Sequence, residues 1–143
     1  MPDDLASANV NRTYSLAATS IAIFTFTMVF LYPRYASGEA NAALFQVTLV
    51  VMAITTFSFG FSAFHYYGAA MRERFGDAER ATFARRGDRL WVIGTTLLFL
   101  EPSLVLFTIG LYLVGAVWLA LWVAFAVYGS RNFPRLQTST EAD

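Results

Sequence analysis

The chain has 143 residues, of which 57% are hydrophobic and 14% are charged, and its formal net charge at pH 7 is zero. This length suits a single domain, but the composition excludes an ordinary soluble one, in which about a quarter of the residues are charged. The chain has no cysteine, which excludes disulfides, thiolate chemistry and cysteine-ligated metals. These features predict an all-α membrane protein.

Apolar residues are concentrated in three stretches that carry almost no charge, and each is longer than the roughly 18 residues that mark a membrane-spanning helix. The stretches are 13–33, 40–71 and 90–128, and only Glu101 interrupts the third. As one helix, the third stretch would be about 58 Å long, nearly twice the ~30 Å hydrocarbon thickness. We therefore expect it to fold back near Gly110. The prediction is a four-transmembrane-helix bundle with spans at about 13–32, 41–67, 90–109 and 111–128.

The segments between these spans are short and polar. Residues 1–12 are expected to form a cytoplasmic tail, and Pro33 is expected to close the first span. Within the arginine-rich loop 71–89, we expect a short cytoplasmic amphipathic helix over 78–86, stopped before the third span by the Gly-Asp pair that follows it. Residues 130–143 are expected to form a second cytoplasmic tail.

The basic residues indicate the orientation in the membrane. All ten are arginines, and with the N-terminus inside, only Arg34 lies outside. This bias predicts a multi-pass protein of the cell (inner) membrane with both termini in the cytoplasm. Six of these arginines lie in the 71–89 loop: Arg72, Arg74, Arg80, Arg85, Arg86 and Arg89. They are expected to contact anionic lipid headgroups. Docking of a soluble partner is the alternative, and no binding of nucleic acid is expected.

One acid lies within an apolar stretch. Glu101 is followed by Pro102, and in mid-span its ionised form is costly, so we expect it to be neutral at pH 7 and to donate a hydrogen bond. Pro102 cannot donate to the carbonyl of Leu98, so a kink is expected beside the acid. An alternative threading places residues 101–103 in an outer turn, but it leaves only about 16 Å of apolar helix before that turn.

Hydroxyl side chains are the expected partners of this acid. Counting residues from the helix ends places Thr25, Thr55 or Thr56, and Trp118 at the depth of Glu101. The second span also carries a polar stripe that could line an ion path or could simply pack against other helices: Thr48, Thr55, Ser58, Ser62 and His65. His65 could respond to pH at a pore mouth, or it could bond to water and headgroups at the interface.

Ala116, Ala120 and Ala124 form a smooth ridge on the fourth span, against which another helix of this bundle or of a second copy could pack. With one histidine and no cysteine, a single chain offers no zinc site or bis-histidine haem site, so no metal and no cofactor is expected.

Three kinds of function agree with these features. The first is permeation, in which a channel or proton-coupled transporter subunit uses Glu101 to bind the ion or proton. The second is an accessory or assembly subunit of a membrane complex, in which Glu101 fixes helix packing. The third, a membrane enzyme acting on a lipid, is disfavoured because the sequence shows no metal cluster and no evident nucleophile.

Overall fold

Four α-helices make up the protein. The computed structural model describes the backbone of residues 2–140 and the side chains of residues 7–129 and 131. Within the described part, the elements are α1 (Pro2–Ala36), α2 (Ala42–Ala70), α3 (Asp77–Thr108) and α4 (Tyr112–Thr140), and there is no strand. Each helix is long and apolar enough to cross a membrane. The fold is therefore that of a small multi-pass membrane protein, as the composition predicts.

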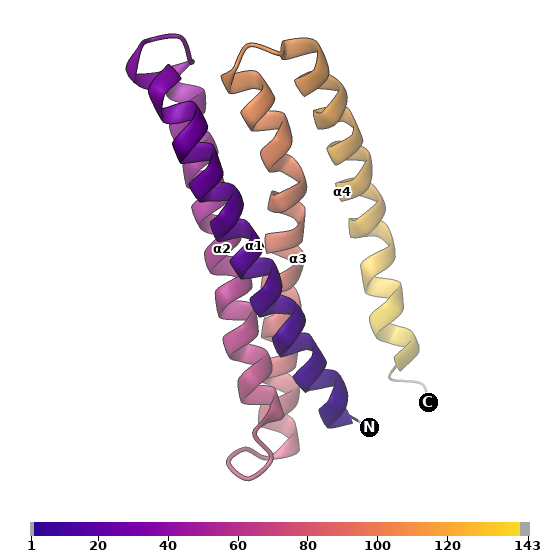
Figure 1. The fold of residues 1–143 in the computed structure, drawn as a ribbon. Coiled ribbons are helices and arrows are strands. Elements are labelled where there is room, and N and C mark those ends of the chain that lie inside the picture. The colour runs from indigo at the N-terminus through magenta and orange to yellow at the C-terminus, as the bar shows by residue number, and fades with distance from the viewer. Residues whose placement is uncertain (1, 141–143) are drawn as a thin grey trace.

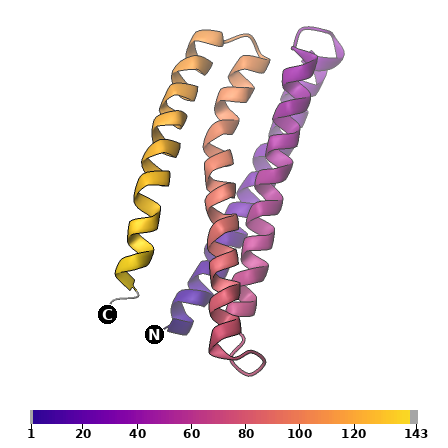
Figure 2. The ribbon, with the colours of Figure 1, turned by 180° about the vertical axis from the view of Figure 1, so that it is seen from behind.

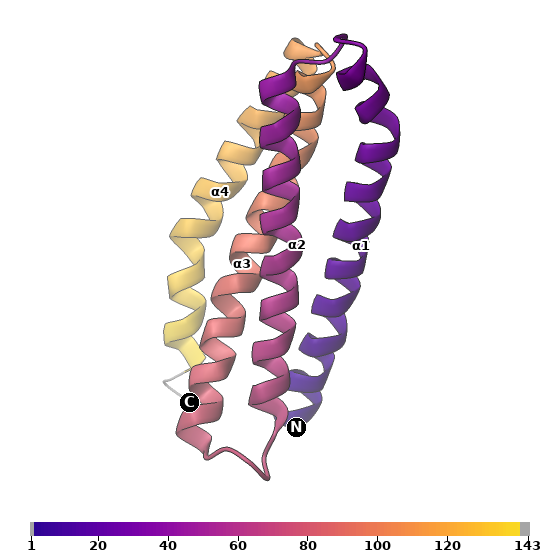
Figure 3. The ribbon, with the colours of Figure 1, turned by 90° about the vertical axis from the view of Figure 1, so that its left-hand side faces the viewer.

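The helices stand in a row in chain order. Figure 3 shows α4, α3, α2 and α1 side by side, each running antiparallel to the one before it. Within the described residues, α2 packs against both α1 and α3, and α1 also touches α3, where Arg12 lies over Trp91. In contrast, the described part of α4 packs only against α3. The start of α1, the end of α4 and the α2–α3 loop lie at one end of the row, and the other two loops lie at the opposite end (Figure 1). We call these the terminal end and the loop end.

Glycine makes the turn between α3 and α4. Gly110 has φ of 82°, a left-handed conformation that costs glycine little and other residues more. Its N–H donates to the carbonyl of Phe107, and the next N–H donates to the carbonyl of Leu106, which closes α3. The predicted fold-back near Gly110 is confirmed. The alternative threading with a turn at residues 101–103 is wrong, because α3 continues through Pro102 to Thr108.

Several helix boundaries differ from the predictions. The first helix begins at Pro2 rather than near residue 13, and it passes through Pro33 to end at Ala36. The helix expected over 78–86 is not a separate element, because it forms the first part of α3, which continues through Gly87 and Asp88. Gly87 packs against the ring of Tyr66, so a tertiary contact outweighs the local stop signal. In the predicted tail, the backbone of 130–140 continues α4, while 141–143 lie outside the described residues.

The buried positions of α1 and α2 follow seven-residue repeats. Buried positions on α1 carry hydroxyls at Thr13, Ser20 and Thr27. Buried positions on α2 repeat with the same spacing in two series, Phe45, Met52, Phe59 and Tyr66 together with Thr48, Thr55, Ser62 and Ala69. A seven-residue repeat returns to nearly the same face after two helical turns, so each series forms a straight seam along its helix.

Glycines let α3 approach α2 closely. A Cβ placed on Gly94 would lie 3.0 Å from the ring of Phe59, and one placed on Gly87 would lie 3.1 Å from the ring of Tyr66. Small residues at such contacts are the usual way for membrane helices to pack, because lipid provides no hydrophobic driving force between them. The same seven-residue register continues along α3 to Glu101 and then to Thr108.

Side chains also fasten α4 to α3. The indole N–H groups of Trp118 and Trp122 donate to the carbonyls of Phe99 (2.9 Å) and Thr96 (2.7 Å), and the Ser103 hydroxyl donates to the carbonyl of Gly115 (3.0 Å). Seen from behind in Figure 2, α4 is the outermost helix beside α3. Its other faces are covered by no other helix of the described chain.

Candidate functional site

Glu101 lies within α3, seven residues before its end, and its side chain is 2% exposed. The hydroxyl of Thr55, which is 0% exposed, interacts with its carboxyl group from α2. That hydroxyl also donates to its own helix, at 2.9 Å from the carbonyl of Val51. Of the partners predicted by depth, Thr55 is therefore the residue that the structure brings to the acid.

One carboxyl oxygen of this acid has no partner among the residues that the structure describes. Oε1 of Glu101 is buried and makes no hydrogen bond to any described residue. An unsatisfied polar atom in an apolar environment costs about 1–3 kcal/mol, and more if it carries charge. Such an atom is therefore expected to bind a water, a proton or an ion at least part of the time.

Two other predicted partners of Glu101 do not meet it. Thr25 is exposed on α1, and its hydroxyl donates to the carbonyl of Ile21. Thr56 is half-buried on α2, and its hydroxyl donates to the carbonyl of Met52. Trp118 has the predicted depth, because its indole bonds to the carbonyl of Phe99, two residues from Glu101. It reaches the backbone of α3 rather than the acid.

The hydroxyl stripe on α2 is buried, and it divides into two kinds of position. The end members bond across to α3: Thr48 lies 3.2 Å from the hydroxyl of Thr108, and Ser62 donates to the carbonyl of Gly87 at 2.7 Å. These two act as helix–helix contacts, as in the packing interpretation. Thr55 and Ser58 occupy the middle of the stripe and are buried at 0% and 6% exposure.

His65 lies near the terminal end of α2 and is half-buried. Its ring packs against Phe64 and Phe83, with centroids 6.2 and 5.9 Å away. Its Nδ1 is buried and has no partner among the described residues. It is ten residues, or nearly three helical turns, further along α2 than Thr55, so it does not share the surroundings of Glu101.

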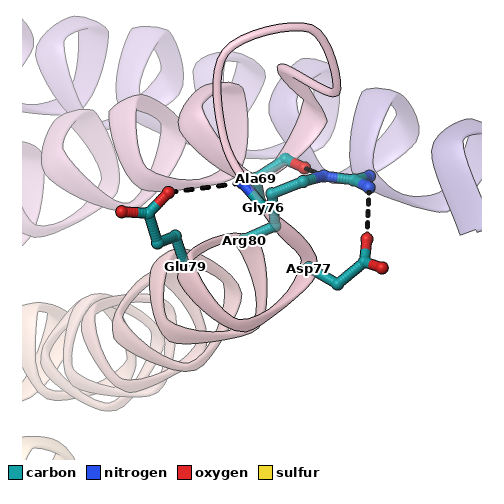
Figure 4. Close-up of polar contacts among 5 residues, drawn as sticks. All are labelled: Ala69, Gly76, Asp77, Glu79 and Arg80. Atoms are coloured by element: carbon teal, nitrogen blue, oxygen red, sulfur yellow. Dashed lines mark hydrogen bonds and ion pairs between the residues drawn. The ribbon is translucent and has the colours of Figure 1, made fainter.

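The arginine-rich loop is fixed by one of its own arginines. Figure 4 shows Arg80 donating from Nε to the carbonyl of Ala69 (2.7 Å) and from Nη1 to Asp77 (3.5 Å), while Glu79 accepts from the N–H of Gly76 (3.2 Å). Arg80 therefore caps the end of α2 and is less available to lipid than predicted. The other loop arginines have exposed side chains: Arg72, Arg74, Arg85, Arg86 and Arg89.

Several buried polar residues were not among the predicted site residues. On α1, Ser20 is 2% exposed, and its Oγ has no hydrogen-bond partner in the described chain. On α3, Thr95 is half-buried, and its Oγ1 likewise has no hydrogen-bond partner in the described chain. The signal for Ser20 was present in the sequence, because Thr13, Ser20 and Thr27 repeat at seven in the same way as the stripe on α2. For Thr95 the sequence holds no comparable repeat.

No group of three or more metal-binding side chains comes together among the described residues. Comparisons with models of protein families, with curated proteins and with solved structures find no match to this chain.

Proposed function

We propose that the protein is a multi-pass protein of the cell membrane that conducts protons or cations, or couples transport to them, with Glu101 as the binding residue. The observation that carries this proposal is a fully buried acid, within an apolar helix, whose Oε1 has no partner in the described chain. Acids inside membrane spans are costly, and they typically belong to ion or proton pathways.

Two further buried oxygens without a described partner would suit a hydrated route. Thr95 lies six residues before Glu101 on α3, towards the terminal end, and it also has a buried oxygen without a partner among the described residues. Ser20 on α1 offers a third such oxygen. Buried water normally satisfies groups of this kind, making about three hydrogen bonds each. A chain of waters between α1, α2 and α3 would serve as the route for a proton.

The proposal includes an orientation. The start of α1 and the end of α4 lie at the same end of the row (Figure 1), and the exposed arginines of the α2–α3 loop lie there too. By the positive-inside rule, we assign this end to the cytoplasm. The chain lacks cysteine, so single cysteines at the exposed Ser37 and Gly76 can be labelled in intact cells with a membrane-impermeant maleimide. Labelling at Ser37 alone is expected, and labelling at Gly76 alone would reverse the assignment.

Flux into liposomes tests the function. Proton and potassium flux would be measured across pH 5–8 for the wild type and for Glu101→Gln, a near-isosteric change that removes the titrating group. The wild type is expected to conduct, and the variant is expected to fall to the flux of protein-free liposomes or to lose its pH dependence. Glu39→Gln is the matched control, because Glu39 is exposed in a loop.

Two threonines provide a second matched pair. Thr55→Val removes the hydroxyl beside Glu101, whereas Thr25→Val removes an exposed hydroxyl predicted to have the same depth. Only the first change should alter flux. Equal flux from wild type, Glu101→Gln and Thr55→Val would refute the assignment of the site.

An accessory or assembly role is the second candidate. Its support comes from the end members of the α2 stripe, which contact α3, and from α4, which packs on one helix only. An uncovered face in a membrane helix suits a partner chain or a second copy. Well-folded wild type that shows no flux at any pH would favour this role over permeation.

A further inference from the structure

A polar cavity of about 170 Å³ lies between α1, α2 and α3, well away from Glu101. Six residues line it: Asn9, Arg12, Thr13, Tyr66, Asp88 and Trp91. They come from the terminal end of all three helices. Because Arg12 is exposed, the cavity opens to the outside of the bundle at this residue.

The depth of this cavity matches a layer of lipid headgroups. A ~30 Å hydrocarbon core takes ~20 helical residues. At the loop end, α1 ends at Ala36, α2 begins at Ala42 and α3 ends at Thr108. Counting about 20 residues from these positions places the other boundary of the hydrocarbon core near residue 16 of α1, residue 62 of α2 and residue 88 of α3. Asp88 lies at that boundary, Trp91 lies three residues inside it, and the other four lining residues lie three to seven residues beyond it. Trp91 and Tyr66 are of the type that favours this interface.

The cavity contains one positive and one negative group that do not neutralise each other. The Arg12 guanidinium lies over the ring of Trp91, with Cζ 4.8 Å from the ring centroid. One oxygen of Asp88 accepts a hydrogen bond from the hydroxyl of Tyr66. No ion pair joins Arg12 to Asp88 in the described part of the chain. Each group is therefore held in place by an aromatic residue while its charge stays available.

We propose that this cavity binds the headgroup of phosphatidylethanolamine, with its phosphate at Arg12 and its ammonium at Asp88. A guanidinium presents a planar fork of N–H donors that suits phosphate, and the side-chain amide of Asn9 adds a further donor. A carboxylate has about four acceptor sites, so Asp88 can accept from an ammonium while it holds Tyr66. The ligand thus carries both charges that the cavity leaves uncompensated.

This chemistry discriminates between common phospholipids. Phosphatidylcholine has the same charges, but its quaternary ammonium has no N–H to donate to Asp88. Phosphatidylglycerol has the phosphate but no positive group, so it leaves Asp88 unpaired beside an anion. Leaving a charged group without its hydrogen bond costs more than leaving a neutral one. Phosphatidylethanolamine is therefore expected to bind more tightly than either of the other two.

Native mass spectrometry of the full-length protein tests this inference. The protein in detergent would be mixed with equal amounts of the three lipids, all with the same acyl chains, and the bound lipids would be counted. We expect phosphatidylethanolamine to be enriched about fivefold over phosphatidylcholine. Asp88→Asn should abolish that preference and keep the Tyr66 hydrogen bond, because the amide oxygen still accepts. Arg12→Gln should weaken the binding of all three lipids.

Controls separate this site from general lipid contact. Arg89→Gln removes an exposed charge next to Asp88 that does not line the cavity, and it should leave the preference unchanged. Circular dichroism would verify folding, and Arg12→Lys, which keeps the charge, replaces Arg12→Gln if that variant unfolds. The inference is overturned if wild type shows no preference or if Asp88→Asn retains it. Displacement of the lipid by free glycerophosphoethanolamine would also overturn it, in favour of a soluble ligand.

Discussion

Replacing Gly94 by alanine is expected to weaken the packing of α2 on α3. The new Cβ would lie 3.0, 3.1 and 3.2 Å from three ring atoms of Phe59, whereas ordinary contacts begin at 3.4 Å, so the ring must move by up to about 0.4 Å. Phe59 is 0% exposed and cannot turn away into lipid. Overpacking of this kind costs about 1–3 kcal/mol. Against it stands the helix propensity of alanine, which favours the change by about 1 kcal/mol.

A matched substitution separates these two effects. Gly60 also lies within a helix, but a Cβ added there would meet nothing within 4 Å, so Gly60→Ala gains propensity without the clash. The two variants should therefore differ in free energy of unfolding by about 1–3 kcal/mol, with Gly94→Ala the less stable. Unfolding by dodecyl sulfate in bicelles, followed by circular dichroism, measures this difference. Equal stabilities would show that Phe59 does not pack against Gly94 as described. Combining Phe59→Leu with Gly94→Ala should recover part of the stability that Gly94→Ala loses.

Two further substitutions test the other contacts of α3. Changing both Trp118 and Trp122 to phenylalanine removes the two indole hydrogen bonds to α3, each worth about 0.6 kcal/mol in a membrane. The distribution of α3–α4 distances measured between spin labels should become broader, while that of α2–α3 distances should not change. Gly110→Ala should cost about 1–2 kcal/mol because φ is 82° there. The same bicelle assay should show this loss, and a stability equal to that of Gly60→Ala would rule out the left-handed turn.

The sequence predicts the number of spans because this depends on length and hydropathy alone. A stretch of about 39 apolar residues must fold back, and Gly110 is the residue that permits a left-handed turn near its middle. The same length argument correctly places Glu101 inside a helix. These predictions need no knowledge of which helix packs against which.

Which face of a helix is buried depends on its neighbours, and here the prediction was weaker. Depth counting selects Thr25 for α1, but Thr25 is exposed and Thr27, two residues on and about 200° around the helix, is buried. The continuation of α3 through Gly87 and Asp88 has the same origin. Tyr66 packs on the glycine and donates to the aspartate, so a contact distant in sequence outweighs the local preference for a helix end.

The α2–α3 contact itself bears on whether Glu101 is there only for packing. Along α3, the seven-residue series places Gly87 under the ring of Tyr66 and Gly94 under the ring of Phe59. Its next member is Glu101. At Gly87 and Gly94 close packing is achieved with the smallest residue, and an alanine or glycine in place of Glu101 would leave no carboxyl oxygen without a partner. The acid thus carries a cost of about 1–3 kcal/mol that helix packing does not require. A residue that costs stability without improving packing is what the proposed proton or cation site requires.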